Sequence, residues 1–328
     1  MKVLVVSGIW PPDVGGPASH APEVASFLRS RGHDVEVVTT ADTAPASEDY
    51  PVRWVRRSLP PGVRHAEGVR LVHERARRWG LWHGSLEDFQ ASAPLTTLPL
   101  RLARDADVRR AAHVITPSSF LRQLALGWGV ESRRATVLPN PAPPVPELRP
   151  RDELRTELGL DGPTLAFAGR LTAQKSLDLG IEAVRRAGVA LVVAGEGPDR
   201  AALERLGHAR FVGPLPRQRV LELFRAADAS LLSSSWENFP HTVVEALAVG
   251  TPVIATRTGG VAEVVHDGEN GIVVEPDDVD ALTHAIERFF ADSELEARLR
   301  ANAAPSVAAY APERVYAQLE RILVEAAG

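Results

Sequence analysis

The chain has 328 residues, of which 45% are hydrophobic and 24% charged, as expected for a globular protein with two domains. Its net charge of −5 argues against nucleic-acid binding, and the lack of cysteine excludes disulfides, thiol nucleophiles and cysteine-ligated metals. No apolar run approaches a transmembrane span, and residues 1–6 are too short for a signal peptide, so we predict a cytoplasmic location.

The first residues predict a βαβ unit. Residues 2–7 form a continuous apolar run, which indicates a strand buried on both faces. A glycine-rich loop with Gly15 and Gly16 follows, and then a helix over residues 18–31 and a strand over 35–39. A Gly-Gly turn at the carboxyl end of a strand lets the backbone approach a phosphate, although the same dipeptide also occurs in ordinary turns.

An arginine-rich segment follows a predicted strand at residues 50–57. Eight arginines lie between Arg53 and Arg78. One interpretation is a solvated amphipathic helix; the other is a basic face that meets anionic lipid at the inner face of the membrane, or a phosphorylated acceptor. His65, His73 and His83 lie nearby, and none belongs to a motif, so surface positions are favoured over catalytic ones.

The pattern then becomes regular up to a proline-rich connector. We predict a helix over residues 95–111, a strand over 112–116, a helix over 120–127 capped by the serines before it, and a strand over 135–138. Asp105-Ala106-Asp107 matches a DxD metal motif, but it falls in a helix-like segment and predicts no metal site. Five prolines within residues 141–150 mark a domain boundary.

Two cations follow the first strand of the second half. That strand covers residues 164–168, and Arg170 and Lys175 come after it, ahead of a helix. Cations at the carboxyl end of a strand suit a diphosphate, which arginine grips as a fork and lysine as a point charge; the alternative is two surface cations. Further strands are expected at 191–194, 210–213 and 272–274, with a helix over 220–227 and another over 279–290 capped by Asp277. Asp278-Val279-Asp280 predicts no metal site either.

Two carboxylates frame a helix start beyond the strand at residues 229–232. Glu237 lies in the loop, Pro240 suits the first turn of the helix, and Glu245 lies among apolar residues before a strand at 252–256. The free N–H groups of a helix start favour an anion, and a carboxylate in an apolar segment needs a partner, for which sugar hydroxyls are suitable. The alternative is an ordinary loop acid and a solvated helix face.

In its wider context this stretch resembles glycosyltransferase family 4, the retaining nucleotide-sugar transferases of the GT-B fold with a group 1 C-terminal domain. The resemblance rests on Glu237 and Glu245 seven residues apart, on EALAVGTPVIATRTGGVAEVV and on DGENGIVVEPDD. It covers nearly the whole chain and weakens over residues 45–80. It implies an α/β fold of two Rossmann-like domains facing across a cleft: residues 1–145 on the acceptor side, shortened around 58–80; residues 146–311 for the nucleotide sugar; and a helix at 312–328 that packs back on the first domain.

The resemblance also implies the site. Catalytic roles fall to Arg170, Lys175 and Glu237, without a metal or any cofactor besides the nucleoside-diphosphate sugar as co-substrate. The diphosphate would be held by Gly15, Gly16, Arg170, Lys175, Pro240, His241, Thr242 and Val243. The donor sugar would contact Glu237, Asn238 and Phe239. The nucleoside would contact Gly195, Leu215, Pro216, Arg217 and Glu245. The acceptor would be a sugar or a lipid-linked molecule.

The short first domain leaves other functions open. Relatives carry further strands and helices there, which help to shape the acceptor side. A nucleotide-sugar-binding protein that has lost transfer is one alternative, and an epimerase that shares the fold is another. A phosphorylase would need a pyridoxal lysine, and Lys2 and Lys175, the only lysines, are poorly placed for it.

Overall fold

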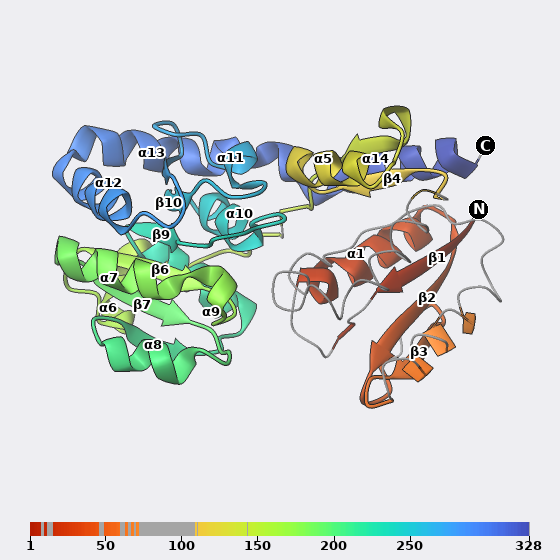
Figure 1. The fold of residues 1–328 in the computed structure, drawn as a ribbon, viewed down its shortest axis with the longest axis horizontal. Coiled ribbons are helices and arrows are strands. Elements are labelled where there is room, and N and C mark those ends of the chain that lie inside the picture. Colours follow the sequence, from red (N-terminus) through yellow and green to blue (C-terminus); the bar gives the residue numbers. More distant parts are fainter. Residues whose placement is uncertain are drawn as a thin grey trace.

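The structure is a computed structural model that describes residues 1–7, 10–11, 16–45 (backbone only at 16–20), 49–59, 63–64, 67–68, 70–71, 109, 111–142 and 144–327. Two α/β halves lie side by side, and the last two long helices, α13 (Ser293–Ser306) and α14 (Pro312–Ala327), follow one another along them (Figure 1). We call the elements from β1 to β5 the N-terminal half and those from α6 to α13 the C-terminal half.

The N-terminal half contains two small parallel sheets. The first, in the order β1-β2-β3, consists of β1 (Lys2–Ser7), β2 (Asp34–Ala41) and β3 (Val52–Arg56). The second pairs β4 (Val114–Thr116) with β5 (Ala135–Val137). The helices are α1 (Gly16–Ser30) and α5 (Ser119–Gly127), with the 3₁₀ turn η1 (Ser132–Arg134) before β5. The elements predicted at these positions are confirmed, with ends that agree to within two residues.

The prediction that residues 2–7 are buried on both faces is wrong. Among the described residues β1 pairs only with β2, so it is an edge strand. Val3, Leu4 and Val5 are half-buried, and Val6 is 57% exposed. An apolar run is compatible with a central strand, but burial on both sides also requires a second neighbouring strand, which a local pattern does not reveal.

The C-terminal half is built on one six-stranded parallel sheet in the order β11-β10-β9-β6-β7-β8. Its strands are β6 (Thr164–Ala168), β7 (Ala190–Ala194), β8 (Arg210–Gly213), β9 (Ala229–Leu232), β10 (Val253–Thr256) and β11 (Gly271–Val274). All six strands that the sequence predicts are confirmed. Counted from β6, the order reads 3-2-1-4-5-6, so its direction reverses between β6 and β9.

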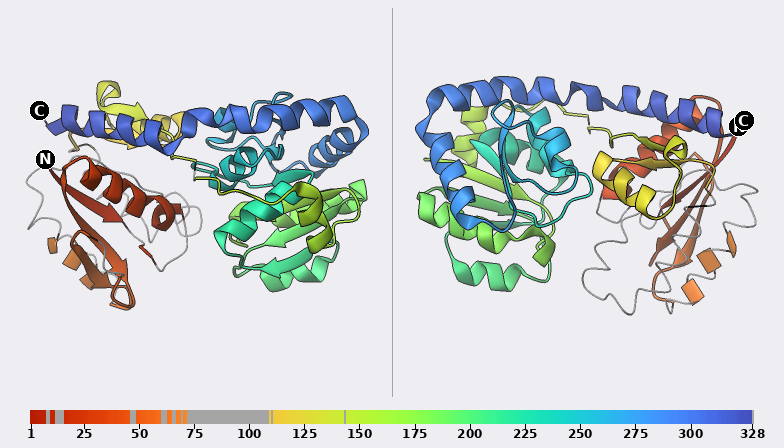
Figure 2. Two further views of the ribbon diagram at one scale, coloured as in Figure 1. Left: turned by 180° about the vertical axis from the view of Figure 1, so that it is seen from behind. Right: turned by 45° about the horizontal axis from the view of Figure 1, so that its top comes forward.

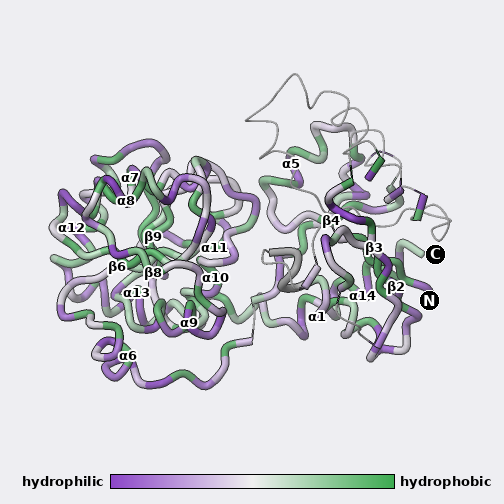
Figure 3. Tube along the Cα trace, turned by 90° about the horizontal axis from the view of Figure 1, so that it is seen from below, coloured by the Kyte–Doolittle hydropathy of each residue, from purple (hydrophilic) through white to green (hydrophobic). Residues whose placement is uncertain are grey.

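Apolar side chains on both faces of this sheet explain why its strands read as continuous hydrophobic runs. Every residue of β6, β9 and β10 is buried. One core joins alternate strand residues to α9 and α10, and the other joins the remaining ones to α7 and α12. The apolar strands therefore lie inside the half (Figure 3). The surrounding helices are α6 (Arg151–Leu158), α7 (Leu177–Ala187), α8 (Arg200–Leu206), α9 (Arg217–Ala226), α10 (His241–Ala248), α11 (Val261–Val264), α12 (Val279–Ala291) and α13 (Ser293–Ser306), with the 3₁₀ turns η2 (Ala173–Lys175) and η3 (Ala308–Tyr310).

Helix α14 (Pro312–Ala327) leaves the C-terminal half and packs on the N-terminal half (Figure 2). Val315, Leu319 and Ile322 join a core with residues of β4 and of the segment after β5. The Tyr316 hydroxyl donates to Glu23 at 2.7 Å, and Glu320 accepts from Arg31 at 3.1 Å. None of the helices that the structure describes is long and apolar enough to cross a membrane.

The cap of α12 differs from the prediction by one residue. Asp278, rather than Asp277, accepts the Ala281 N–H at 2.8 Å. Asp277 has φ +59°, outside the extended range that a capping residue adopts. Asp280 forms an ion pair with Arg186 at 2.6 Å, so both carboxylates of this DxD match have structural partners. The predicted helix over residues 95–111, with Asp105-Ala106-Asp107, lies almost entirely outside the described residues.

Candidate active site

The candidate site lies at the point where the strand order of the six-stranded sheet reverses. Parallel strands β6 and β9 are neighbours there, and the loops that leave their carboxyl ends supply functional side chains. Lys175 ends the 3₁₀ turn η2 after β6, and Glu237 lies between β9 and α10. Open α/β sheets bind ligands outside the carboxyl ends of strands at such a point.

Lys175 and Glu237 form a buried ion pair. Lys175 Nζ lies 2.5 Å from Glu237 Oε1, and the two side chains are 16% and 7% exposed. The Ser234 hydroxyl also donates to Glu237 Oε1, at 2.7 Å, and Ser234 is fully buried. The carboxylate is therefore fixed by a cation and a hydroxyl at once, while no bond to its second oxygen is recorded among the described residues.

Hydrogen bonds to backbone carbonyls tie the two loops into one unit. Gln174 Nε2 donates to the Trp236 carbonyl at 2.7 Å, and the Ser235 N–H donates to the Gln174 carbonyl at 2.9 Å. The Ser233 hydroxyl donates to the Lys175 carbonyl at 3.0 Å. The sequence analysis did not identify Gln174 or Ser234, although the run of three serines before Trp236 was a signal that the loop satisfies its own polar groups.

Glycines let the neighbouring loops approach these residues. A Cβ on Gly259, which has φ +50°, would lie 1.5 Å from the Glu237 carbonyl oxygen. A Cβ on Gly195, at φ +145°, would lie 1.8 Å from the oxygen of Gly169. Side chains are thus excluded at both positions, and the loops after β6, β7, β9 and β10 meet at one edge of the sheet.

Arg170 is exposed, and its guanidinium has no hydrogen-bond or ion-pair partner in the described part of the chain. It follows Gly169, which lies close to the Lys175 side chain: a Cβ built on Gly169 would be 3.9 Å from Lys175 Cε. Arginine forks bind phosphate oxygens in pairs, so Arg170 is available for an anion in a way that the paired Lys175 is not.

The start of α10 is already partly satisfied by the backbone. The His241 N–H donates to the Phe239 carbonyl at 3.0 Å, and the Val243 N–H donates to the Pro240 carbonyl at 3.0 Å. Pro240 occupies the N-cap position and makes no side-chain capping bond. His241 Nε2 lies 3.1 Å from Asn140 Nδ2, and its ring packs edge-on against Phe239 with centroids 5.3 Å apart. Phe239, Pro240 and Val243 are buried, while Thr242 is half-buried. Within the described residues, the Thr242 N–H is therefore the donor that this helix start leaves for an anion.

Glu245 meets Arg217 at the other end of the site. Arg217 is the first residue of α9, and its Nε lies 3.5 Å from Glu245 Oε1. Burial raises the pKa of the Glu245 carboxyl above its ordinary value, and the nearby Arg217 opposes that rise. The polar partner expected for Glu245 is thus an arginine. Leu215 and Pro216 directly precede α9, and the Gly195 N–H donates to the Gly213 carbonyl at 2.8 Å, which joins these loops.

Buried polar atoms without a partner gather in the same loops. Three of the nine such atoms within the described residues lie in these loops: Asn238 Oδ1 beside Glu237, Thr172 Oγ1 in the loop before η2, and Thr258 Oγ1 beside Gly259. Buried polar groups in proteins are nearly always hydrogen-bonded, so these atoms point to a ligand or water that completes them.

Several predicted residues fall outside this cluster. Gly15, His65, His73 and His83 lie outside the described residues, and Gly16 is the first residue of α1. In Figure 1 the first turn of α1 lies on the side of its half that faces the C-terminal half. In the arginine-rich segment, Arg53 pairs with Glu36 at 2.5 Å, Arg70 pairs with Glu67 at 2.9 Å, and Arg64 donates to the Arg57 carbonyl at 2.8 Å.

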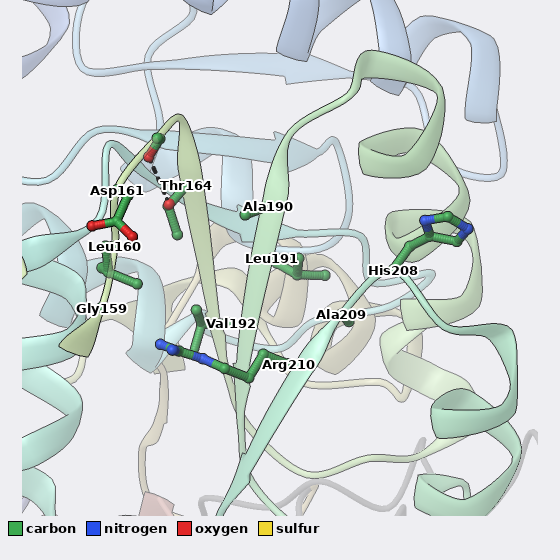
Figure 4. Close-up of a pocket in the computed structure, with 11 residues that line it drawn as sticks. Gly159, Leu160, Asp161, Thr164, Ala190, Leu191, Val192, His208, Ala209 and Arg210 are labelled. Carbon is green, nitrogen blue, oxygen red and sulfur yellow. Dashed lines mark hydrogen bonds between the residues drawn. The ribbon is translucent and has the colours of Figure 1, made fainter.

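A hollow of about 320 Å³ lies at the opposite edge of the sheet (Figure 4). Thr164, Ala190 and Arg210 line it from the amino-terminal ends of β6, β7 and β8. The Thr164 hydroxyl is already used by the Gly162 carbonyl at 2.8 Å. Asp161, His208 and Arg210 also line this hollow but lie apart from one another in Figure 4, and the hollow is at the amino-terminal ends of the strands, away from the site described above.

Comparison with known proteins identifies the family. Residues 150–305 match the family of "Glycosyl transferases group 1". A D-inositol 3-phosphate glycosyltransferase of Acidothermus cellulolyticus is 29% identical over 362 residues, covering 88% of this chain and 80% of that protein.

Two solved structures show the same fold. Sucrose-phosphate synthase from Thermosynechococcus elongatus has a TM-score of 0.83 at 20% identity, over 99% of this chain and 98% of that one. Anabaena HepE in complex with UDP-glucose has a TM-score of 0.80 at 21% identity, over 99% and 100%. Residues 150–305 therefore carry a domain of the group 1 glycosyltransferases, and the chain as a whole has the GT-B fold, with two α/β halves.

Proposed function

We propose that the protein transfers a sugar from a nucleoside-diphosphate sugar to an acceptor hydroxyl, with retention of configuration and without a metal ion or further cofactor. The observation that carries the proposal is the buried contact of Lys175 with Glu237 at the strand-order reversal, beside the unpaired Arg170. The contact holds Lys175, a cation suited to a diphosphate, next to Glu237, a carboxylate suited to sugar hydroxyls.

The main electrostatic demand of such a reaction is the charge of the leaving diphosphate. Arg170, Lys175 and the N–H groups at the start of α10 supply positive potential at one edge of the sheet, and Gly15 and Gly16 would add backbone N–H groups from the N-terminal half. The bond from the anomeric carbon to the phosphate oxygen breaks, and a bond from that carbon to the acceptor oxygen forms on the same face. The acceptor proton passes to the departing phosphate.

Glu237 would hold the donor sugar. Its Oε1 is occupied by Lys175 and Ser234, which leaves Oε2 to accept a sugar hydroxyl. Asn238 and Phe239 would complete this side, and the buried Asn238 Oδ1, which lacks a partner within the described residues, suits a hydroxyl donor. This arrangement makes Lys175 a shared cation between the carboxylate and the incoming diphosphate.

Glu245 would accept the ribose hydroxyls, and the backbone around Leu215, Pro216 and Gly195 would contact the base. The ion pair with Arg217, at 3.5 Å, keeps Glu245 partly compensated when no ribose is bound. The UDP-glucose complex of HepE supports a nucleotide sugar as the donor and makes UDP the first nucleotide to test.

The acceptor would be a sugar or a lipid-linked molecule that enters from the N-terminal half. A lipid-linked acceptor would bring the segment from Arg53 to Arg78 to the inner face of a membrane. Because Arg53 and Arg70 already pair with carboxylates, we expect this contact to be weak and sensitive to salt. Flotation with anionic and with neutral vesicles tests it.

One observation favours a second candidate, a nucleotide-sugar-binding protein without transfer. Within the described residues β1 pairs only with β2, and Val6 is 57% exposed, which is compatible with an acceptor half smaller than that of an active transferase. The purified protein should be mixed with UDP-, GDP- and ADP-sugars labelled in the sugar, and with lysate lipids and oligosaccharides as acceptors. A labelled product establishes transfer, saturable donor binding without product favours the binding protein, and a free isomerised sugar would indicate an epimerase.

A further inference from the structure

Glu263, a residue with no assigned role, joins the two halves beside the candidate site. It lies in the four-residue helix α11, which follows Gly259 and Gly260. Its Oε2 accepts the N–H of Ser119 at 2.9 Å, and its Oε1 accepts the N–H of Phe120 at 3.2 Å. Both N–H groups belong to the first turn of α5 in the N-terminal half, 143 and 144 residues away in the sequence.

Charge and geometry make this an effective link. The first N–H groups of a helix have no partner within the helix, and the positive end of the helix dipole favours an anion. Ser118, the N-cap of α5, satisfies only the Leu121 N–H, at 3.2 Å. Glu263 therefore satisfies two of the remaining donors, and two bonds to successive N–H groups restrict rotation of one half against the other.

The link bears on the loop that carries Glu237. A Cβ on Gly260 would lie 2.8 Å from the Asn238 carbonyl oxygen and 2.8 Å from Ser118 Cβ, so Gly260 is packed between the donor loop and α5. Gly259 packs in the same way on the backbone of Glu237. Gly260 thus lies close to both α5 and the donor loop, so a shift of α5 relative to α11 would act on the loop at this contact.

Tyr310 contacts both Glu263 and the donor loop. Its hydroxyl donates to the Glu263 carbonyl at 3.2 Å, and burial raises the pKa of the phenol, which keeps the hydroxyl a donor. Its ring packs on Phe239 with centroids 6.0 Å apart, and its carbonyl accepts the Ala142 N–H of the connector between the halves at 2.7 Å. Tyr310 thus contacts Glu263, Phe239 and the connector at the same time.

We propose that Glu263 is a positioning residue that couples the arrangement of the two halves to the placement of Glu237. The proposal deepens the transferase function and rests on it. By accepting the two N–H groups of α5, Glu263 stabilises the arrangement of the halves in which the donor loop and the N-terminal half both border the reacting centre. Small misplacements of reacting groups cost large factors in rate. The nucleotide contacts proposed above, apart from those of Gly15 and Gly16, lie within the C-terminal half and stay intact.

The distance between the halves tests the proposal directly. Because the chain lacks cysteine, Gln123→Cys on α5 and Glu287→Cys on α12, both exposed, allow spin labels on the two halves. Double electron–electron resonance should give one narrow distance distribution in the otherwise unchanged protein, a clearly broader one in Glu263→Ala, and an intermediate one in Glu263→Gln, which keeps one acceptor oxygen.

The matched control is Asp292→Ala. Asp292 also caps a helix, accepting the Leu295 N–H of α13 at 2.9 Å, but within the C-terminal half. It should leave the distribution narrow. Equal distributions for Glu263→Ala and the unchanged protein, or equal broadening in Asp292→Ala, would overturn the proposal.

Kinetics separates this proposal from the function on which it depends. With the donor that supports transfer, Glu263→Ala should lower kcat by about tenfold or more and leave the Kd for the nucleoside diphosphate within about twofold. Asp292→Ala should change neither quantity. A weakened Kd with unchanged kcat would contradict a positioning role. If no nucleotide binds to the unchanged protein, the proposed function fails, while the resonance measurement still decides whether Glu263 holds the halves together.

Discussion

Lys175 and Glu237, 62 residues apart in the chain, are in contact at 2.5 Å with both side chains largely buried. Removing one member of a buried ion pair leaves an uncompensated charge, whereas removing both leaves none. Loss of one member should therefore lower both stability and activity, whereas loss of both members should restore stability but not activity. This difference can be measured.

We expect Lys175→Met to lower the free energy of unfolding by about 3 kcal/mol, because Glu237 would stay buried without its cation. The double variant Lys175→Met with Glu237→Gln should recover most of this loss and yet show no transfer, since both proposed functions are gone. Chemical denaturation and a turnover assay measure the two effects. Arg186→Ala, which breaks the exposed pair with Glu182, serves as the control and should change little. A double variant as unstable as the single one would refute this account of the pair.

Arg170→Ala should weaken binding of a nucleoside diphosphate by about tenfold without changing the melting temperature. The guanidinium is exposed and has no partner within the described residues, so folding does not depend on it, whereas a charge-assisted bond to phosphate is lost. Calorimetric titration with UDP at two salt concentrations measures the loss. Arg288→Ala, an exposed arginine on α12 without a recorded partner, is the control. Equal affinities for the two variants would remove Arg170 from the site.

Glu245→Gln should bind nucleotide more weakly and yet be relatively more stable at neutral pH. Burial raises the pKa of this carboxyl, so the folded state holds its proton more firmly than the unfolded state. The stability that this contributes is present below the unfolded pKa and is lost as pH rises through the folded pKa. The melting temperature of the variant relative to the unchanged protein should therefore increase from about pH 4.5 upward. A constant difference across pH 4 to 8 would argue against a buried, perturbed Glu245.

Gly259→Ala should damage the site far more than Gly268→Ala. Both glycines have positive φ, +50° and +74°, so both variants carry the cost of a left-handed residue, about 1 kcal/mol. Only at Gly259 would the new methyl group collide with the carbonyl oxygen of Glu237, since nothing lies within 4 Å of the Gly268 position. Melting curves and donor binding of the two variants compare the effects. Similar losses would mean that backbone strain alone, and not the packing on Glu237, matters at Gly259.

Local sequence signals predicted the C-terminal half well. Its six strands are short and largely apolar runs, with β6, β9 and β10 buried throughout, and glycine, proline or a polar residue follows each of them, so each strand could be located without knowing its neighbours. The contact of Lys175 with Glu237 also follows from the fold, because the loops after β6 and β9 meet at the strand-order reversal. Arg217 as the partner of Glu245 depends on how far a side chain reaches, which a sequence pattern does not define.

The failures involve contacts between distant segments. The run at residues 2–7 could not reveal that β1 lies at an edge among the described residues, because that depends on a strand from elsewhere in the chain. Glu263 stands within GGVAEVV, but its partners Ser119 and Phe120 are more than 140 residues away. Ser234 bonds Glu237 only three residues on, and a closer reading of the serine run could have found it.

The most direct test of the central claim compares nucleoside diphosphates with their nucleosides. UDP, GDP and ADP, each beside uridine, guanosine or adenosine, should be titrated into the unchanged protein and into Arg170→Ala with Lys175→Met. The account predicts that one diphosphate binds at least ~100-fold more tightly than its nucleoside and that this preference nearly disappears in the double variant. Equal binding of diphosphate and nucleoside, or a preference that survives the loss of both cations, would contradict it.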